Sequence, residues 1–174
     1  TLFPPSEQHR INSLSTRIHA GLSNAVYRAG LARSQAAYED AVQHVFSTLD
    51  YLEEQLNQSR YLCGTILTAC DLQLFASLAR FDTVYATHFR CTRKRLTDYP
   101  ALWGYARDLH ALPGISETID FAAILDGYYS NDGDHNPYGI IAEQPHINWD
   151  AAHDREALGA RKIWHRTDGP ICFQ

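Results

Sequence analysis

Thiol chemistry is the first kind of chemistry that this sequence offers. The cysteines are too few and too scattered for a disulfide framework and form no C-x-x-C pair, so we expect reduced thiols at Cys63, Cys70, Cys91 and Cys172. A thiol becomes reactive where a helix N-terminus or cationic neighbours lower its pKa. Cys91, with Arg90 and Arg93 nearby, is the better candidate for a reactive thiol. Cys70 lies in the first turn of a helix expected to be buried, and Asp71 beside it opposes ionisation.

Metal binding is the second kind of chemistry to consider, because the chain contains nine histidines. Four of them lie in the C-terminal part, without tight ligand spacing or partner cysteines: His135, His146, His153 and His165. We therefore predict no metal site. For His88, further upstream, we predict a structural hydrogen-bonding role.

Composition and charge restrict the class of partner. The chain has 174 residues, a net charge of −5 and a pI near 5.9, which argue against a nucleic-acid or anionic-membrane surface. No apolar run approaches the roughly 18–20 residues of a membrane span, and the N-terminus lacks the basic and apolar blocks of a signal peptide. We expect a cytoplasmic protein of one domain, with no nucleic-acid or membrane partner. The absence of an initial methionine is consistent with a missing upstream segment.

Helices must position these side chains, because helical periodicity recurs along the chain and period-two alternation does not. The clearest helix is predicted over 35–57, where apolar residues repeat at three and four. A first helix is expected over 6–21. A buried one follows a capping box, in which Thr68 is the N-cap and Asp71 reaches back to the free amide.

Two more helices follow. One begins at Pro100 and ends at Pro113-Gly114, and a shorter one covers about 116–129. From Ser130 onwards Gly, Asn, Asp and Pro accumulate, so we predict an irregular tail over 130–174 that packs on the domain. The fold class is therefore all-α, a bundle of about five or six helices with an irregular C-terminal tail.

Several segments carry a resemblance to a known family: SNAVYRAGLA at 23–32, RFDTVYATHFRC at 80–91, DYPALWGYARDL at 98–109, NPYGII at 136–141 and HDRE at 153–156. In this order they resemble motifs of the Xi-class glutathione transferases, the glutathionyl-hydroquinone reductases. The resemblance spans roughly residues 3–159 and places them in the C-terminal helical domain of that family.

The resemblance implies a division of the chain and a partner. Residues 1–159 correspond to the glutathione transferase C-terminal-like helical domain, and 160–174 form an extension without a recognised counterpart. In the family, the nucleophilic cysteine and most of the glutathione site lie on a thioredoxin-like N-terminal domain, which is expected to be absent from this chain. We therefore expect a chain that is inactive without that domain. Glutathione is the implied co-substrate, and a homodimer is a further expectation by analogy.

Tyrosines carry the chemistry that the resemblance assigns to this half. In the family, a thiolate attacks the glutathionyl group of an aromatic quinol conjugate, and tyrosine hydroxyls hydrogen-bond the quinol oxygen. Tyr27 matches the first such tyrosine, and the second falls in the pair Tyr128-Tyr129. Adjacent helical residues diverge by about a third of a turn, so one of the pair faces the pocket and we favour Tyr128. Tyr85 either lines the same pocket or packs in the core.

Some positions depart from the family pattern. Ser23-Asn24-Ala25 stands where Asn-Asn-Gly is typical, and Leu125 stands where lysine is common. These departures favour an alternative from a different class, a free-standing and non-catalytic helical module that binds proteins or small aromatic ligands.

Overall fold

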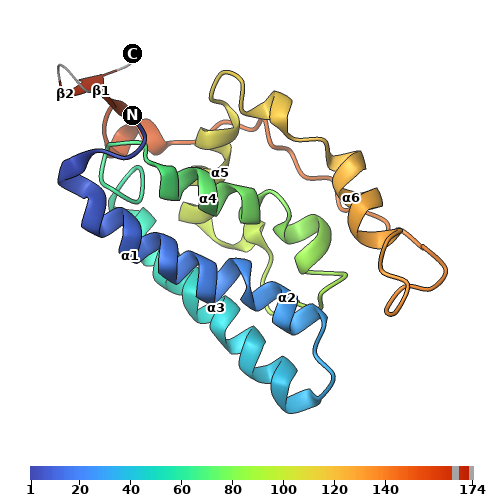
Figure 1. The fold of residues 1–174 in the computed structure, drawn as a ribbon. Helices are drawn as coiled ribbons and strands as arrows, with labels where there is room; N and C mark the ends of the chain where they lie inside the picture. Colours follow the sequence, from blue (N-terminus) through green and yellow to red (C-terminus); the bar gives the residue numbers. More distant parts are fainter. Residues whose placement is uncertain (166–168, 173–174) are drawn as a thin grey trace.

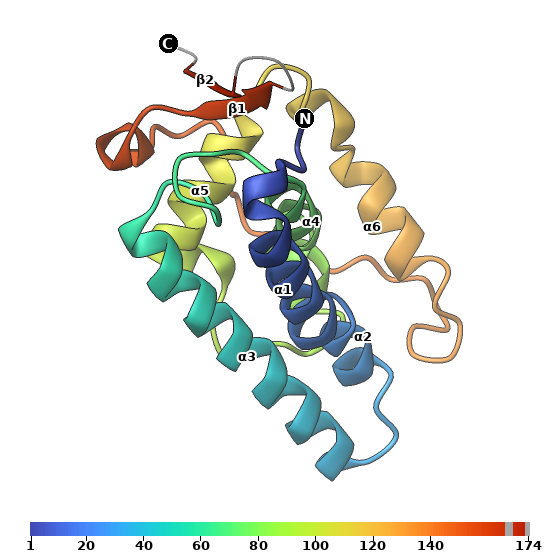
Figure 2. The ribbon, with the colours of Figure 1, turned by 60° about the vertical axis from the view of Figure 1, so that its left-hand side comes forward.

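The computed structural model describes residues 1–165 and 169–172, with side chains as far as Ile163. Within that part of the chain, the prediction of an all-α bundle is confirmed (Figure 1) by six α-helices: α1 Gln8–Ile18, α2 Ala25–Gly30, α3 Gln35–Gln58, α4 Ala69–Leu78, α5 Pro100–His110 and α6 Phe121–Tyr129. Helix α4 lies in the middle of the molecule, with α3 on one side and α6 on the other (Figure 2). None of the described helices is long and apolar enough to cross a membrane.

Helix α3 provides the longest wall of the core. It begins at the N-cap Ser34, whose hydroxyl accepts a hydrogen bond from the backbone amide of Ala37 at 3.2 Å. Its predicted apolar stripe is fully buried, and this stripe includes Val45, Phe46 and Leu52. Because α2 and α5 pack against it, α3 fixes where the chain segment that carries Tyr27 lies.

Helix α4 begins at the predicted capping box. The Asp71 carboxylate accepts hydrogen bonds from both the backbone amide and the hydroxyl of Thr68, each at 2.8 Å. It also accepts one from the backbone amide of Leu62 and one from the Tyr105 hydroxyl, both at 2.9 Å. Asp71 is fully buried, and these four bonds join a loop, α4 and α5 at one carboxylate.

Two π-helical turns interrupt the regular helices where the sequence predicted continuous ones. The first, His19–Ser23, follows α1, and the second, Phe81–Tyr85, follows α4. In the first turn Gly21 lies against α3, where a Cβ would stand 2.1 Å from Thr48 Oγ1. A π-helical turn holds one more residue than an α-helical turn, so it redirects the side chains that follow. The first turn leads into α2, and the second turn contains Tyr85.

The segment after α6 is largely irregular, as predicted, but it ends in a short hairpin. Strands β1 (Lys162–His165) and β2 (Gly169–Cys172) pair antiparallel, with Lys162 opposite Cys172. The carbonyl of Lys162 also accepts a hydrogen bond from the amide of Leu67 at 2.9 Å. Strands of four residues are too short for period-two alternation to be detected in the sequence. The hairpin and the N-terminus lie at the same end of the molecule (Figures 1 and 2).

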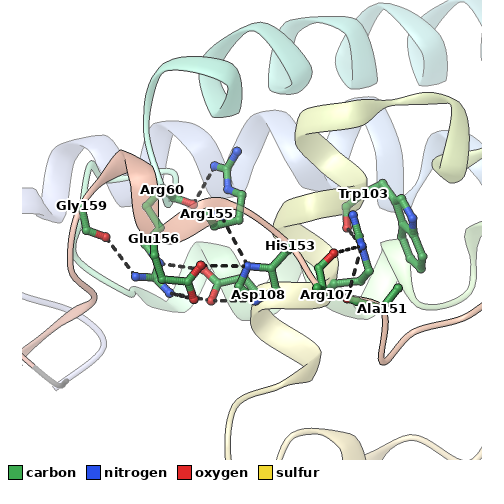
Figure 3. Close-up of polar contacts among 10 residues, drawn as sticks. Arg60, Trp103, Arg107, Asp108, Ala151, His153, Arg155, Glu156 and Gly159 are labelled. Carbon is green, nitrogen blue, oxygen red and sulfur yellow. Dashed lines mark hydrogen bonds and ion pairs between the residues drawn. The ribbon is translucent and has the colours of Figure 1, made fainter.

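A cluster of buried polar groups fastens this segment to the bundle (Figure 3). Arg60 donates two hydrogen bonds to the Asp108 carboxylate, each at 2.8 Å, and both residues are almost fully buried. Arg155 donates to three backbone carbonyls where α3 ends, those of Leu56, Ser59 and Arg60. A cation is favourable there, because the last carbonyls of a helix have no partners within the helix.

Candidate functional site

Three of the four predicted site tyrosines meet in one cluster. They come from three elements, because Tyr27 lies on α2, Tyr85 on the π-helical turn after α4, and Tyr128 on α6. The hydroxyl of Tyr128 lies 2.5 Å from that of Tyr27 and 3.4 Å from that of Tyr85. Tyr27 is 39% exposed and Tyr85 only 3%, so the cluster runs from the surface into the core.

Tyr129 points away from this cluster. Its side chain is buried, and its hydroxyl donates a hydrogen bond to the backbone carbonyl of Thr83 at 3.2 Å. The geometry of α6 therefore separates the adjacent pair as the helical repeat requires, with Tyr128 beside Tyr27 and Tyr129 packed inside.

Phe89 holds the three rings in place. Its ring centroid lies 5.2 Å from that of Tyr27, 5.7 Å from that of Tyr85 and 5.8 Å from that of Tyr128. Gly30 makes room for it, since a Cβ at that position would lie 2.3 Å from Phe89 Cδ1. Sequence reasoning did not single out either residue, although both lie in the quoted motifs. Their approach joins positions 59 residues apart, which no local pattern reveals.

The hydroxyls of Tyr27 and Tyr85 are held in their neutral form. Burial, followed by the hydrogen bond with Tyr128, raises the pKa of Tyr27 to about 12. Burial and the same neighbour raise the pKa of Tyr85 further, while the nearby Arg80 guanidinium opposes the rise at both rings. At neutral pH these groups are therefore hydrogen-bond donors, able to support an oxygen that gains negative charge.

A hollow of about 420 Å³ opens beside Tyr128, between the end of α4 and α6. Its walls include Arg80 and Ile124, and both residues also line an apolar groove that runs along α4 past Phe75 and Ile119. An apolar cleft with a few polar groups at one end is the usual form of a small-molecule site. The arrangement suits an aromatic ring whose oxygen points at the tyrosines.

The described cysteines do not offer a nucleophile at this site, because Cys63, Cys70 and Cys91 are all buried. The prediction of a reactive thiol at Cys91 is wrong. Burial raises the pKa of that thiol to about 12 and outweighs the Arg90 guanidinium. The guanidinium itself donates to the carbonyl of Gly30 at 2.7 Å. The side chain of Cys172 lies outside the described ones.

The structure brings histidines that are far apart in the sequence into two clusters of polar side chains. Nε2 of His153 lies 3.7 Å from Asp108 Oδ1, and its Nδ1 lies 3.4 Å from Glu156 Oε2 (Figure 3), close enough for the three side chains to hold a metal ion. However, Arg60 already binds both oxygens of Asp108, which accounts for this cluster as an ion network. These residues were not grouped beforehand because about 45 positions separate the histidine from Asp108. The side chain of His165 is outside the described part.

The second cluster joins the end of α6 to the aromatic residues. Nε2 of His88 lies 2.9 Å from Asp132, and Nδ1 of His135 lies 2.8 Å from the same carboxylate. Burial alone would raise the pKa of Asp132, but these two hydrogen bonds outweigh it and lower that pKa. The structural role predicted for His88 is therefore found, next to Phe89.

Comparison with known proteins gives consistent matches. The family model for the glutathione S-transferase C-terminal domain matches residues 35–108. Glutathionyl-hydroquinone reductase YqjG of Escherichia coli (strain K12) is 44% identical over 154 residues, which covers 88% of this chain and 47% of that protein. The glutathione-bound structure of YqjG matches with a TM-score of 0.88 at 43% identity, covering 89% of this chain and 50% of that one.

A Xi-class glutathione transferase from Natrialba magadii matches with a TM-score of 0.88 at 38% identity, over 90% of this chain and 49% of that chain. The chain belongs to the Xi-class glutathione transferase family. The resemblance found in its motifs is thereby confirmed, and the helices described above form the C-terminal-like helical domain of that class. This Xi-class domain spans about half the length of the curated relatives that it matches.

One further relative bears on the segment after residue 159. The structure of a putative glutathione S-transferase from Corynebacterium glutamicum matches with a TM-score of 0.91 at 36% identity, over 99% of this chain and 59% of that one. A match of that extent continues beyond the region of the recognised motifs. The alignment with this relative therefore extends into the segment after residue 159.

Proposed function

We propose that this Xi-class domain provides the substrate-binding wall of an enzyme that reduces glutathionyl-hydroquinones to hydroquinones with glutathione. The observation that carries the proposal is the pair of hydroxyls on Tyr27 and Tyr128, which lie 2.5 Å apart, with Tyr128 on the wall of the hollow. Similarity to the reductase YqjG supports the same reaction.

The chemistry divides between this domain and a thioredoxin-like partner. A thiolate of the partner domain attacks the sulfur of the conjugate, the bond from sulfur to the ring carbon breaks, and that carbon takes a proton. The glutathionyl group is then held as a mixed disulfide, which a second glutathione converts to glutathione disulfide. Tyr27 and Tyr128 donate to the quinol oxygen and stabilise the negative charge that develops on it while the bond breaks.

The apolar groove is the surface that fits the partner domain. It begins near Leu2 and Ile163 and continues between α4 and α6, past Leu72 and Ile115, to Ile124. A contiguous apolar groove is one kind of surface at which protein partners bind. With the partner seated here, its thiolate would face the ring held by the tyrosines.

The replacement of Tyr27 by Phe, in the complete protein that contains this domain, tests the proposal. Loss of one donor to the developing oxyanion should lower kcat/KM for a glutathionyl-hydroquinone by about 100-fold. Tyr129→Phe is the matched control, because that hydroxyl donates to a backbone carbonyl inside the fold and its loss should leave kcat/KM nearly unchanged.

Full activity in a folded Tyr27→Phe protein would contradict the proposal. Absence of reductase activity in the wild-type complete protein would instead favour the alternative of a non-catalytic helical module, for which the apolar groove would serve as a protein-binding surface.

A further inference from the structure

Arg80 has an unusual position for a charged residue. It follows α4 directly and precedes the π-helical turn that contains Tyr85, and its side chain lines both the hollow and the apolar groove. Its guanidinium donates to the carbonyl of Ala76, one turn earlier on α4, at 2.6 Å. In the described part of the chain, no carboxylate forms an ion pair with it.

The acidic residue that lines the hollow already has a hydrogen-bond partner. Asp120 also lines the hollow, but its carboxylate caps α6 and accepts a hydrogen bond from the amide of Ala123 at 3.0 Å. Its charge is therefore directed at the N-terminus of α6. The positive charge of Arg80 remains available to a ligand. It also acts on the hydroxyls of Tyr27 and Tyr85, because it opposes the rise in their pKa values.

We propose that Arg80 is a specificity-determining residue that selects aromatic substrates with an anionic substituent on the ring, such as a carboxylate. The inference rests on the proposed function, because it takes the tyrosine cluster as the place where the quinol oxygen binds. A ring that occupies the hollow between Ile124 and Tyr128 would bring a substituent on its far edge towards Arg80. A guanidinium binds carboxylates in a planar, two-pronged geometry, and it does so more strongly where apolar walls limit water.

The test compares two quinols that differ in charge. The 174-residue chain is titrated with 2,5-dihydroxybenzoate and with neutral methylhydroquinone under anaerobic conditions, and both affinities are measured from NMR shifts. The variants are Arg80→Gln, Arg80→Lys and Tyr128→Phe. Arg28→Gln is the charge-matched control, because Arg28 pairs with Asp40 at 3.6 Å on the side of α2 that faces α3.

The wild-type chain should prefer the anionic quinol, and Arg80→Gln should weaken its binding roughly fivefold while methylhydroquinone binds as before. Arg80→Lys should retain part of the preference, and Arg28→Gln all of it. Equal preference in the wild type and Arg80→Gln would overturn the role of Arg80. If Tyr128→Phe still weakened both ligands in that case, the proposed function would stand. If neither quinol bound the wild-type chain, both proposals would fail.

Discussion

At the hydroxyl of Tyr128, three side chains from separate parts of the sequence converge, and their placement depends on residues without reactive groups of their own. Tyr27, Tyr85 and Tyr128 could be named in advance because family motifs contain them. Phe89 and Gly30 could not be named, since their contact depends on how closely α2 approaches the turn that follows Phe81–Tyr85. Arg80 was quoted within a motif, but only the structure places its guanidinium at the hollow.

Adding even one methyl group at Gly30 should lower the stability of the fold. Gly30→Ala would force a methyl group into the Phe89 ring, and overpacking of this kind costs about 1–3 kcal/mol of unfolding free energy. Urea denaturation of the 174-residue chain measures it. Gly127→Ala is the matched control, because a Cβ there meets no atom within 4 Å and should stabilise α6 by roughly 0.5–1 kcal/mol. Equal stability of the Gly30→Ala variant and the wild type would contradict this account of the packing.

At the scale of elements, hydrophobic periodicity and capping residues predicted the helices well. The stripe over 35–57 and the Thr68 cap lie where α3 and α4 are found. The π-helical turns were missed because a single extra residue in a turn leaves no mark on helical periodicity. The hairpin was missed because its strands are too short. The tail was predicted to pack on the domain, but the bonds that hold it there were not, since Arg60, Asp108 and Arg155 form them across long stretches of sequence.

Asp108 should contribute strongly to the attachment of that segment. Asp108→Asn would leave the buried guanidinium of Arg60 without its counter-charge, which should cost about 3 kcal/mol of unfolding free energy at pH 7. Asp40→Asn is the control, because Asp40 is exposed and its ion pairs should contribute less than about 1 kcal/mol. Chemical denaturation of both variants and the wild type measures the difference.

The same substitution should change how stability depends on pH. Burial alone would raise the pKa of Asp108, but the hydrogen bonds from Arg60 outweigh it and lower that pKa in the folded state. The stability that Asp108 contributes is therefore fully present above the pKa of an aspartate in the unfolded chain, about 3.9. It is lost as the pH falls through the lower pKa of Asp108 in the folded state. Wild-type stability should drop across this acidic range, and Asp108→Asn should lack that part of the drop. The same acid dependence in both proteins would contradict the assignment.

At the scale of the whole molecule, the hollow and the apolar groove adjoin each other, because Arg80, Thr118 and Ile124 line both. Core residues such as Phe75 form part of the groove wall, and Leu72 and Ile115 on the same wall are only partly buried, which leaves apolar surface that a second body could cover. Dependence on a thioredoxin-like domain stays a prediction from the resemblance, while the path of the groove required the structure. In the proposed function the domain supplies donors and walls, and its described thiols are buried.

The most direct measurement is a crystal structure of the complete protein with methylhydroquinone bound. The account predicts that the ring lies in the hollow beside Ile124, with one oxygen about 2.6–3.2 Å from the hydroxyls of Tyr27 and Tyr128. A quinol bound elsewhere, with neither of these two hydroxyls bonded to it, would contradict the central claim that the tyrosine cluster receives the substrate oxygen.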